Sequence, residues 1–264
     1  MCLYCIYIVY IPVYIKFCVY CLILFIIIFY IAIADSHAGI CALVVGTRVS
    51  IVPGYSKWQC INDVPLTNPC SGKWPGVTCW RDKIVGISLR RKLIDGSIPA
   101  EFSRLTSLTY LDLSGNAFSS SLPIDIGDFT NLKYLNIGGN AYLGGTLPIS
   151  FNKLIHLQHL YLSVNRISGD LPIYLSSFTD FISLSIWNTN LKGTLPTEMG
   201  LLTALRHLEL SRNSITGTIP IEIVKLTRLK LLDVSYNYLN LSQGIPTPIK
   251  SIIPFVMHKN QKEL

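Results

Sequence analysis

The 264-residue sequence predicts an α/β repeat solenoid, and its internal periodicity is the main reason. Apolar residues recur in the pattern L-x-x-L-x-L-x-x-N, as in residues 108–116 and 205–213. In five places a G-x-[IL]-P segment follows the pattern. A period of this length is typical of a solenoid. Such a fold presents one long regular surface, which favours binding over catalysis.

Seven repeats account for residues 84–252. Successive repeats are 24 residues apart, except for a step of 25 residues between the third and the fourth. We expect the extra residue, which follows Asn140, to bulge at a turn without disturbing the neighbouring strands. The repeats start at Ile84, Leu108, Leu132, Leu157, Phe181, Leu205 and Leu229.

A short strand opens each repeat. In the fourth repeat Leu157, Leu160 and Leu162 are the apolar residues, and the last two have the spacing of the inward side of a strand. The asparagine that follows can satisfy backbone groups in the turn, which makes it a structural residue. Two repeats lack it: Lys92 is interpreted as an end-repeat departure, and Thr189 as a replacement that supplies one hydroxyl.

The second half of each repeat is predicted to turn and run along the opposite side. Glycine allows the tight turn, and the proline of segments such as Gly217–Pro220 ends ladder pairing. The stretches that follow, such as residues 124–129, are too short for full helices. We expect brief helical or 3₁₀ turns on the convex side.

These motifs together resemble the plant-type class of leucine-rich repeats. That class occurs in ectodomains of receptor-like kinases and receptor-like proteins and in polygalacturonase-inhibiting proteins. The resemblance covers residues 84–246 and implies a leucine-rich-repeat horseshoe with a parallel concave sheet. It is nearly silent on the ligand, because function depends on sites placed on a fold.

Residues 35–83 are similar to the N-terminal cysteine cap of that class. An end repeat would otherwise leave its core facing water, so we expect Trp74 to plug that end. Cys70 and Cys79 can close a short loop, which the resemblance implies is a disulfide. Cys60 fits an earlier part of the cap, with Cys41 as its remaining partner outside the leader. Four cysteines permit three pairings, and the sequence leaves the choice open.

Residues 1–34 form an apolar leader that is a signal peptide or a signal anchor. Its last 22 residues, Val13–Ala34, are long enough to span a bilayer. The small residues Ala32 and Ala34 provide a cleavage pattern before Asp35. Both alternatives place the repeats in the secretory pathway, at the cell surface or outside the cell. The cysteine cap agrees with an oxidising compartment.

The net charge of +7 indicates a modest bias toward acidic partners and is no nucleic-acid signature. Five basic residues lie near the N-terminal edge, and we interpret them as a solvated edge, with an acidic-ligand site as the alternative. The basic residues are Arg81, Lys83, Arg90, Arg91 and Lys92.

Residues 253–264 form a tail without a repeat. Either the tail helps to cap the solenoid or the chain is truncated.

The outward face of the predicted sheet carries the candidate ligand-binding residues. Positions 2, 4, 6 and 7 after each repeat start should point outward. Aromatic rings there can supply much of a binding energy or stack on sugars, although they can also merely shield the sheet. Trp187 replaces the serine found at the sixth position of four other repeats. The candidates are Tyr110, Tyr134, His159, Tyr161, Trp187, His207 and Arg212.

The sequence gives little support to the hypothesis that this protein is an enzyme. His159 and His207 belong to strands two apart, about 10 Å, which is too far for an easy shared zinc ion. No third ligand, nucleophile elbow or phosphate-binding glycine loop is evident. We therefore predict no catalytic residue, no metal site and no cofactor.

The sequence favours a recognition module that binds a peptide, protein or glycan on its concave face. A co-receptor is a further expected partner. An uncleaved leader would also attach the protein to a membrane. The alternative is a structural surface or matrix adhesion protein, or a truncated receptor fragment. Asn240 lies in the sole N-glycosylation sequon, Asn240–Ser242, and is predicted to be glycosylated.

Overall fold

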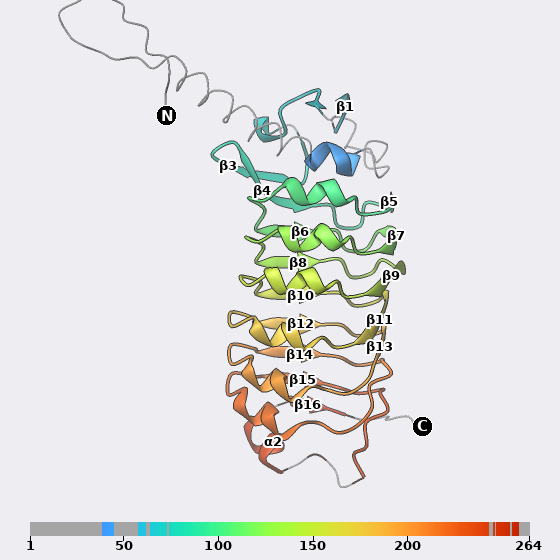
Figure 1. Ribbon diagram of the computed structural model, residues 1–264, viewed down its shortest axis with the longest axis vertical. Helices are drawn as coiled ribbons and strands as arrows, with labels where there is room; N and C mark the ends of the chain where they lie inside the picture. The colour runs from blue at the N-terminus through green and yellow to red at the C-terminus, as the bar shows by residue number, and fades with distance from the viewer. Residues whose placement is uncertain are drawn as a thin grey trace, which may run out of the picture.

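The computed structural model describes residues 39–44, 58–61, 64–72, 74–242, 245, 247–253 and 255–258. The leader and the last six residues lie outside this range. Figure 1 shows the repeats stacked one upon the next along the long axis, from the N-terminal cap to the C-terminal end. This confirms the predicted α/β solenoid.

The concave side is a nine-stranded sheet in which each repeat contributes one strand. Its order is β16-β15-β14-β12-β10-β8-β6-β4-β3, and every pair is parallel except the β3–β4 hairpin. The strands are β3 (Val77–Trp80), β4 (Lys83–Ser88), β6 (Tyr110–Asp112), β8 (Tyr134–Asn136), β10 (His159–Tyr161), β12 (Ser183–Ser185), β14 (His207–Glu209), β15 (Leu231–Asp233) and β16 (Phe255–Met257).

A second parallel sheet of five strands was not predicted. Its strands lie where the chain leaves the asparagine turn of each repeat. The third repeat, which has the extra residue, takes part as well, because the residues around Leu143 pair with both neighbouring repeats. The extra residue leaves the concave sheet undisturbed, as expected, since Tyr134 still pairs with His159. The strands are β5 (Asp95–Gly96), β7 (Ala117–Ser121), β9 (Tyr142–Thr146), β11 (Arg166–Asp170) and β13 (Asn190–Lys192).

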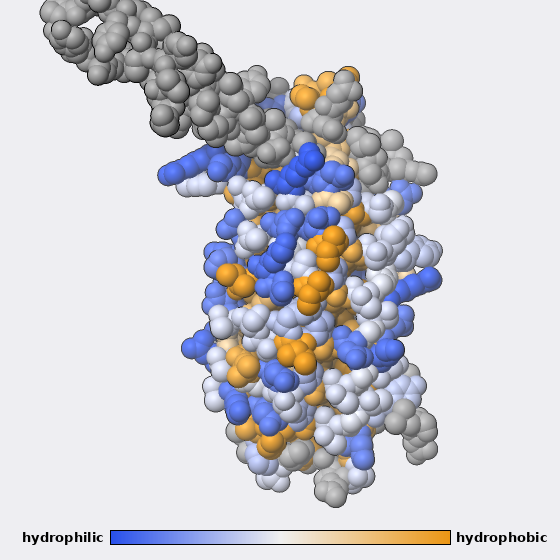
Figure 2. Space-filling model, in the orientation of Figure 1, coloured by the Kyte–Doolittle hydropathy of each residue, from blue (hydrophilic) through white to orange (hydrophobic). Residues whose placement is uncertain are grey.

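Six 3₁₀ helices form the convex side, as the sequence predicts. Each follows a proline in extended conformation and buries one large apolar residue, such as Phe102 or Ile126, whereas other apolar residues, such as Ile149, are exposed. Figure 2 shows apolar groups scattered over this face among polar ones. The helices are η3 (Ala100–Arg104), η4 (Ile124–Asp128), η5 (Ile149–Lys153), η6 (Ile173–Ser177), η7 (Thr197–Leu201) and η8 (Ile221–Lys225).

The asparagine ladder has the structural role predicted for it. The side-chain amide of Asn116 donates to the backbone oxygens of Leu89 and Leu113, both at 2.8 Å, and its oxygen accepts from the Lys92 amide at 2.9 Å. Where Thr189 replaces asparagine, its hydroxyl donates to the side-chain oxygen of Asn213 at 2.6 Å. The ladder therefore satisfies buried backbone groups, which would otherwise be costly to leave unpaired.

The N-terminal cap closes the first end of the core. Disulfides join Cys41 to Cys60 and Cys70 to Cys79, which resolves the three open pairings. Trp74 is buried, as predicted, and stacks on Trp58 with ring centroids 5.1 Å apart. Residues 39–44 are helical, and the other cap elements are β1 (Cys60–Ile61), β2 (Val64–Pro65) and η2 (Pro69–Ser71).

The C-terminal end extends the concave sheet further than the sequence indicates. Helix α2 (Thr247–Ile252) packs beside η8, and β16 pairs in parallel with β15. Part of the predicted tail from residue 253 therefore continues the repeat geometry. Within the described ranges, no helix has the length and apolar character needed to cross a membrane, and the leader lies outside them.

Candidate functional site

Strand register places the outward-facing residues in two straight rows. One row contains the second residue after each repeat start, and the other contains the fourth; the leucines between them, such as Leu135 and Leu160, are buried. The first row reads Gly86, Tyr110, Tyr134, His159, Ser183, His207 and Leu231, and the second reads Ser88, Asp112, Asn136, Tyr161, Ser185, Glu209 and Asp233.

Four aromatic side chains from strands β6, β8 and β10 make one continuous group, here called the ring cluster: Tyr110, Tyr134, His159 and Tyr161. Tyr110 and Tyr134 stack with centroids 4.4 Å apart. Tyr134 also lies 5.5 Å from Tyr161 and 5.9 Å from His159. His159 and Tyr161 are nearly parallel, with centroids 6.2 Å apart. Tyr134 therefore contacts every other ring of the cluster.

Polar groups accompany the ring cluster on the same face. The Asn136 side-chain amide donates to the Tyr134 hydroxyl at 3.4 Å, and the Tyr161 hydroxyl lies 3.4 Å from His159 Nδ1. Asp112 is buried beside the cluster and accepts hydrogen bonds from the amide and hydroxyl of Ser114 at 2.9 and 2.6 Å. The long contacts of the two tyrosine hydroxyls leave capacity for a ligand.

Burial shifts the pKa values of three rings of the cluster so that the neutral form of each is favoured. Burial raises the pKa of Tyr110 to about 12, and the charges of an ionised Tyr134 and of Asp112 add to the rise. Burial also raises the pKa of Tyr134, while the hydrogen bond from Asn136 opposes this rise. The pKa of His159 is lowered, first by burial and then by the nearby His207. The cluster thus favours neutral rings.

The other predicted ligand-binding residues lie outside the ring cluster. His207 shares the first row with His159 but is separated from it by Ser183. Trp187 is half-buried; its backbone amide donates to Ser163 Oγ at 3.0 Å, and no described ring contact joins it to the cluster. Arg212 is exposed and lies over the ring of Tyr236, 4.6 Å from its centroid.

The sixth residue of each repeat was expected to point outward, and serines at this position are buried beside the second row. Asp112 and Ser185 of the second row are buried as well, so burial does not remove these serines from the outward face. The hydroxyls of two of the serines donate to the second-row aspartate two residues earlier, at 2.6 Å. The buried serines are Ser114, Ser163, Ser211 and Ser235.

Comparison with known proteins agrees with the repeats and the cap. Residues 183–239, 107–129 and 156–178 match leucine-rich-repeat families. A stretch of 51 residues is 43% identical to a probable leucine-rich repeat receptor-like protein kinase of Arabidopsis thaliana, which covers 19% of this chain and 5% of that protein. The chain is a plant-type leucine-rich-repeat protein.

Two solved structures illustrate the similarity of this leucine-rich-repeat protein to receptor ectodomains. A plant peptide hormone receptor, RGFR1 in complex with RGF2, is 36% identical over 55% of the chain, with a TM-score of 0.54. The ectodomain of the Arabidopsis thaliana receptor kinase GASSHO1/SCHENGEN3, in complex with CASPARIAN STRIP INTEGRITY FACTOR 2, is 28% identical over 71%, with a TM-score of 0.63. The chain spans 23% of each of these ectodomain chains.

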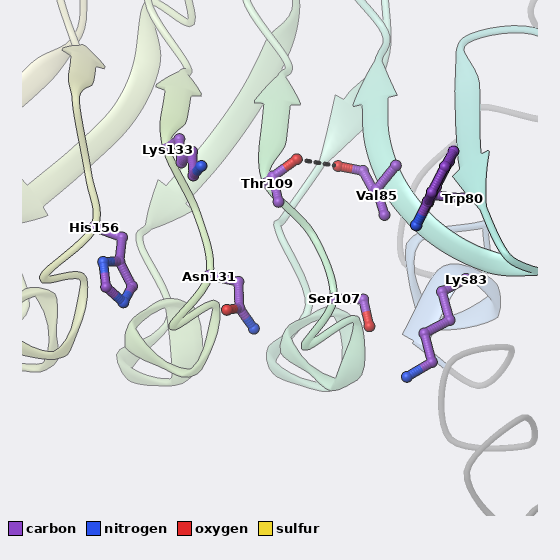
Figure 3. Close-up of a pocket in the computed structure, with 8 residues that line it drawn as sticks. All are labelled: Trp80, Lys83, Val85, Ser107, Thr109, Asn131, Lys133 and His156. Carbon is purple, nitrogen blue, oxygen red and sulfur yellow. Dashed lines mark hydrogen bonds between the residues drawn. The ribbon is translucent and has the colours of Figure 1, made fainter.

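The leucine-rich-repeat protein also has a shallow hollow of about 490 Å³ that the sequence did not reveal. It lies where the chain enters the concave strands of the first four repeats, beside the β3–β4 hairpin (Figure 3). Figure 1 shows this hairpin projecting from the side of the solenoid. The hollow is lined by Trp80, Lys83, Val85, Ser107, Thr109, Asn131, Lys133 and His156.

The part of the chain that the structure describes has no cluster of side chains suited to bind a metal ion. There, no group of three or more histidine, cysteine, aspartate or glutamate side chains is placed to hold an ion. His159 and His207, which the sequence analysis considered, lie two strands apart with Ser183 between them. The site is therefore described by ring contacts and hydrogen-bonding groups.

Proposed function

We propose that this leucine-rich-repeat protein is a non-enzymatic recognition module that binds a peptide or protein on its concave face, through the ring cluster. The observation that carries the proposal is the continuous contact of four rings across three neighbouring strands. Clustered tyrosines offer large, rigid contact area at low cost in side-chain entropy. Their hydroxyl groups have capacity for further hydrogen bonds, which can fix the orientation of a ligand.

The similar receptors support a peptide or protein ligand in particular. One of them is a peptide hormone receptor in complex with RGF2, and the other is a receptor-kinase ectodomain in complex with CASPARIAN STRIP INTEGRITY FACTOR 2. For this chain, we propose a ligand of the same general class and leave its identity to experiment. Two disulfides support exposure of the domain to an oxidising compartment, so we place its function at the cell surface or outside the cell.

A matched pair of variants tests the proposal. Serine occupies the positions equivalent to Tyr134 and Tyr161 in the fifth repeat, so Tyr134→Ser with Tyr161→Ser should preserve the fold. Tyr142→Ser is the control, because Tyr142 is an exposed tyrosine on the other sheet. The full chain, secreted from a eukaryotic host, is screened against secreted peptides and proteins and against glycans.

Peptide or protein hits should lose about tenfold or more in affinity in the double variant and little in the control. Hits that bind all three proteins equally would place recognition elsewhere on the molecule. A screen in which glycans alone bind, and do so through the cluster, would replace the peptide or protein ligand by a glycan.

A further inference from the structure

The hollow beside the β3–β4 hairpin is not used by the proposed function, although it adjoins the ring cluster. Thr109 and Lys133 line the hollow and directly precede Tyr110 and Tyr134 of the cluster. Figure 3 shows the lining side chains in two rows across the entry to the strands. At the usual spacing of parallel strands, four repeats cover about 14 Å. This length matches about four residues of an extended peptide.

The hollow carries positive charge. Lys83 and Lys133 are exposed, and neither makes an ion pair with a described residue. This contrasts with Lys153, whose ammonium lies 2.9 Å from Asp128. Arg81 adds a guanidinium at the tip of the hairpin, 5.5 Å from the ring centroid of Trp80. The hollow is therefore suited to a ligand with negative charge.

The hairpin places an unusually exposed aromatic ring at one end of the hollow. Trp80 has 66% of its surface exposed. Arg81 and Asp82 both have positive φ, which gives the two-residue turn that joins β3 to β4 and directs the hairpin outward. Figure 2 shows hydrophilic groups over this projecting hairpin. An exposed tryptophan beside cationic groups is a typical anchor for a binding partner.

Backbone pairing is already complete along the floor of the hollow. The Thr109 amide donates to the Val85 oxygen at 2.9 Å, and the Lys133 amide donates to the Thr109 oxygen at 2.9 Å. The Thr109 hydroxyl also donates to Val85, at 3.0 Å. A ligand cannot add as a further strand here, so it must be recognised by side chains.

We propose that this hollow is a second binding site that takes an acidic peptide segment. Lys83 and Lys133 contact its carboxylates, and Trp80 packs against an adjacent apolar or aromatic residue. The hollow is open and elongated, which fits a chain better than an enclosed small molecule. Its two rings, Trp80 and His156, lie at opposite ends (Figure 3), whereas a chain of sugars is held best by stacking at several neighbouring positions.

The test uses synthetic hexaglutamate as the probe and hexaglutamine as its uncharged counterpart. Binding to the full secreted chain is measured by calorimetry at low and at physiological salt. Lys83→Gln with Lys133→Gln removes the two hollow ammoniums. Lys192→Gln with Lys225→Gln removes the same charge from exposed positions on β13 and η8 and serves as the control.

We expect hexaglutamate to bind the wild-type chain and to lose about tenfold in affinity in the hollow variant, with less than about twofold change in the control. Equal loss in both variants would show that net charge alone attracts the peptide, and would overturn the site. Absence of binding to the wild-type chain would also overturn it. Binding of trigalacturonate but not of hexaglutamate, sensitive to the same lysines, would assign the hollow to an acidic glycan instead.

This inference stands apart from the proposed role of the ring cluster. The variant carrying Tyr134→Ser and Tyr161→Ser should bind hexaglutamate as the wild-type chain does, because it keeps both lysines. A Trp80→Ala variant should weaken a hexaglutamate peptide extended by one terminal tyrosine more than hexaglutamate itself. If the two peptides weaken equally, Trp80 has no part in the site.

Discussion

Tyr110 and Tyr134 stack with their planes 11° apart, and Tyr134 makes Tyr110 harder to ionise. Burial raises the pKa of Tyr110 to about 12, and a negative charge on Tyr134 contributes to the rise. We therefore expect phenolate absorbance of the native chain to show tyrosines that ionise well above the ordinary value of about 10. Replacing Tyr134 by Ser should lower the pKa of Tyr110, whereas Tyr142→Ser should leave it unchanged.

The sign of the effect on stability follows from the same shift. Between pH 10 and about 12 the unfolded state loses the Tyr110 proton while the folded state retains it. The free energy of unfolding should therefore fall as the pH rises through this window. A denaturant titration in which Tyr134→Ser steepens this fall would contradict the assignment.

His159 should titrate below an ordinary histidine. Its pKa is lowered by burial and then by His207, so acid favours the unfolded state as the pH falls below about 6.5. His207→Gln should raise the pKa of His159, as measured by nuclear magnetic resonance titration of the ring protons. His156→Gln is the control, because His156 is exposed at the hollow. A His159 signal unmoved by His207→Gln would limit the shift to burial.

Gly127 is predicted to be essential for close packing of the convex helices. A methyl group placed there would overlap the carbonyl group of Ser150 in the next repeat, so the backbone would have to move. We expect Gly127→Ala to lower the free energy of unfolding by about 1–3 kcal/mol. Asn152→Ala, at the equivalent exposed position of η5, should change it by less than about 0.5 kcal/mol. Similar melting curves for both variants would contradict this packing.

The sequence predicted those features that depend on one repeat and its period. The two outward rows, the 3₁₀ helices and the asparagine bonds follow from positions such as Leu160 and Asn116, which recur with the same neighbours. The ring cluster was predicted in part, because strand register alone places Tyr110, Tyr134 and His159 in one row.

The missed features depend on contacts that no period encodes. Trp80 belongs to a hairpin before the first repeat, and its place in one hollow with residues of four repeats depends on how the cap joins them. The surroundings of Trp187 were also beyond the pattern, because its backbone amide donates to Ser163 Oγ of the previous repeat and no described ring contact joins it to the ring cluster. The second sheet was missed because residues such as Gly144 carry no strand signal of their own.

Asn240 should carry one N-linked glycan when the chain passes through a eukaryotic secretory pathway. Asn240 is exposed, so its side chain is accessible for glycosylation. Its side-chain oxygen accepts a hydrogen bond from the Ser242 amide at 3.2 Å, which joins the two ends of the sequon. Glycosidase treatment should lower the mass once, and Asn240→Gln should remove the shift. A secreted wild-type chain with no mass shift would show that the sequon is not used.

Trp187→Ser tests whether the outward face extends from the ring cluster to the fifth repeat. Serine is the residue at this position in four other repeats, where it is buried and hydrogen-bonded, so the variant should fold with little change in melting temperature. If Trp187 contacts the ligand, its loss should weaken binding by about 1–3 kcal/mol. The measurement is the affinity of each hit from the ligand screen, beside that of the double tyrosine variant. Unchanged affinity would restrict the site to the cluster, and a large fall in melting temperature would show that the half-buried ring serves packing instead.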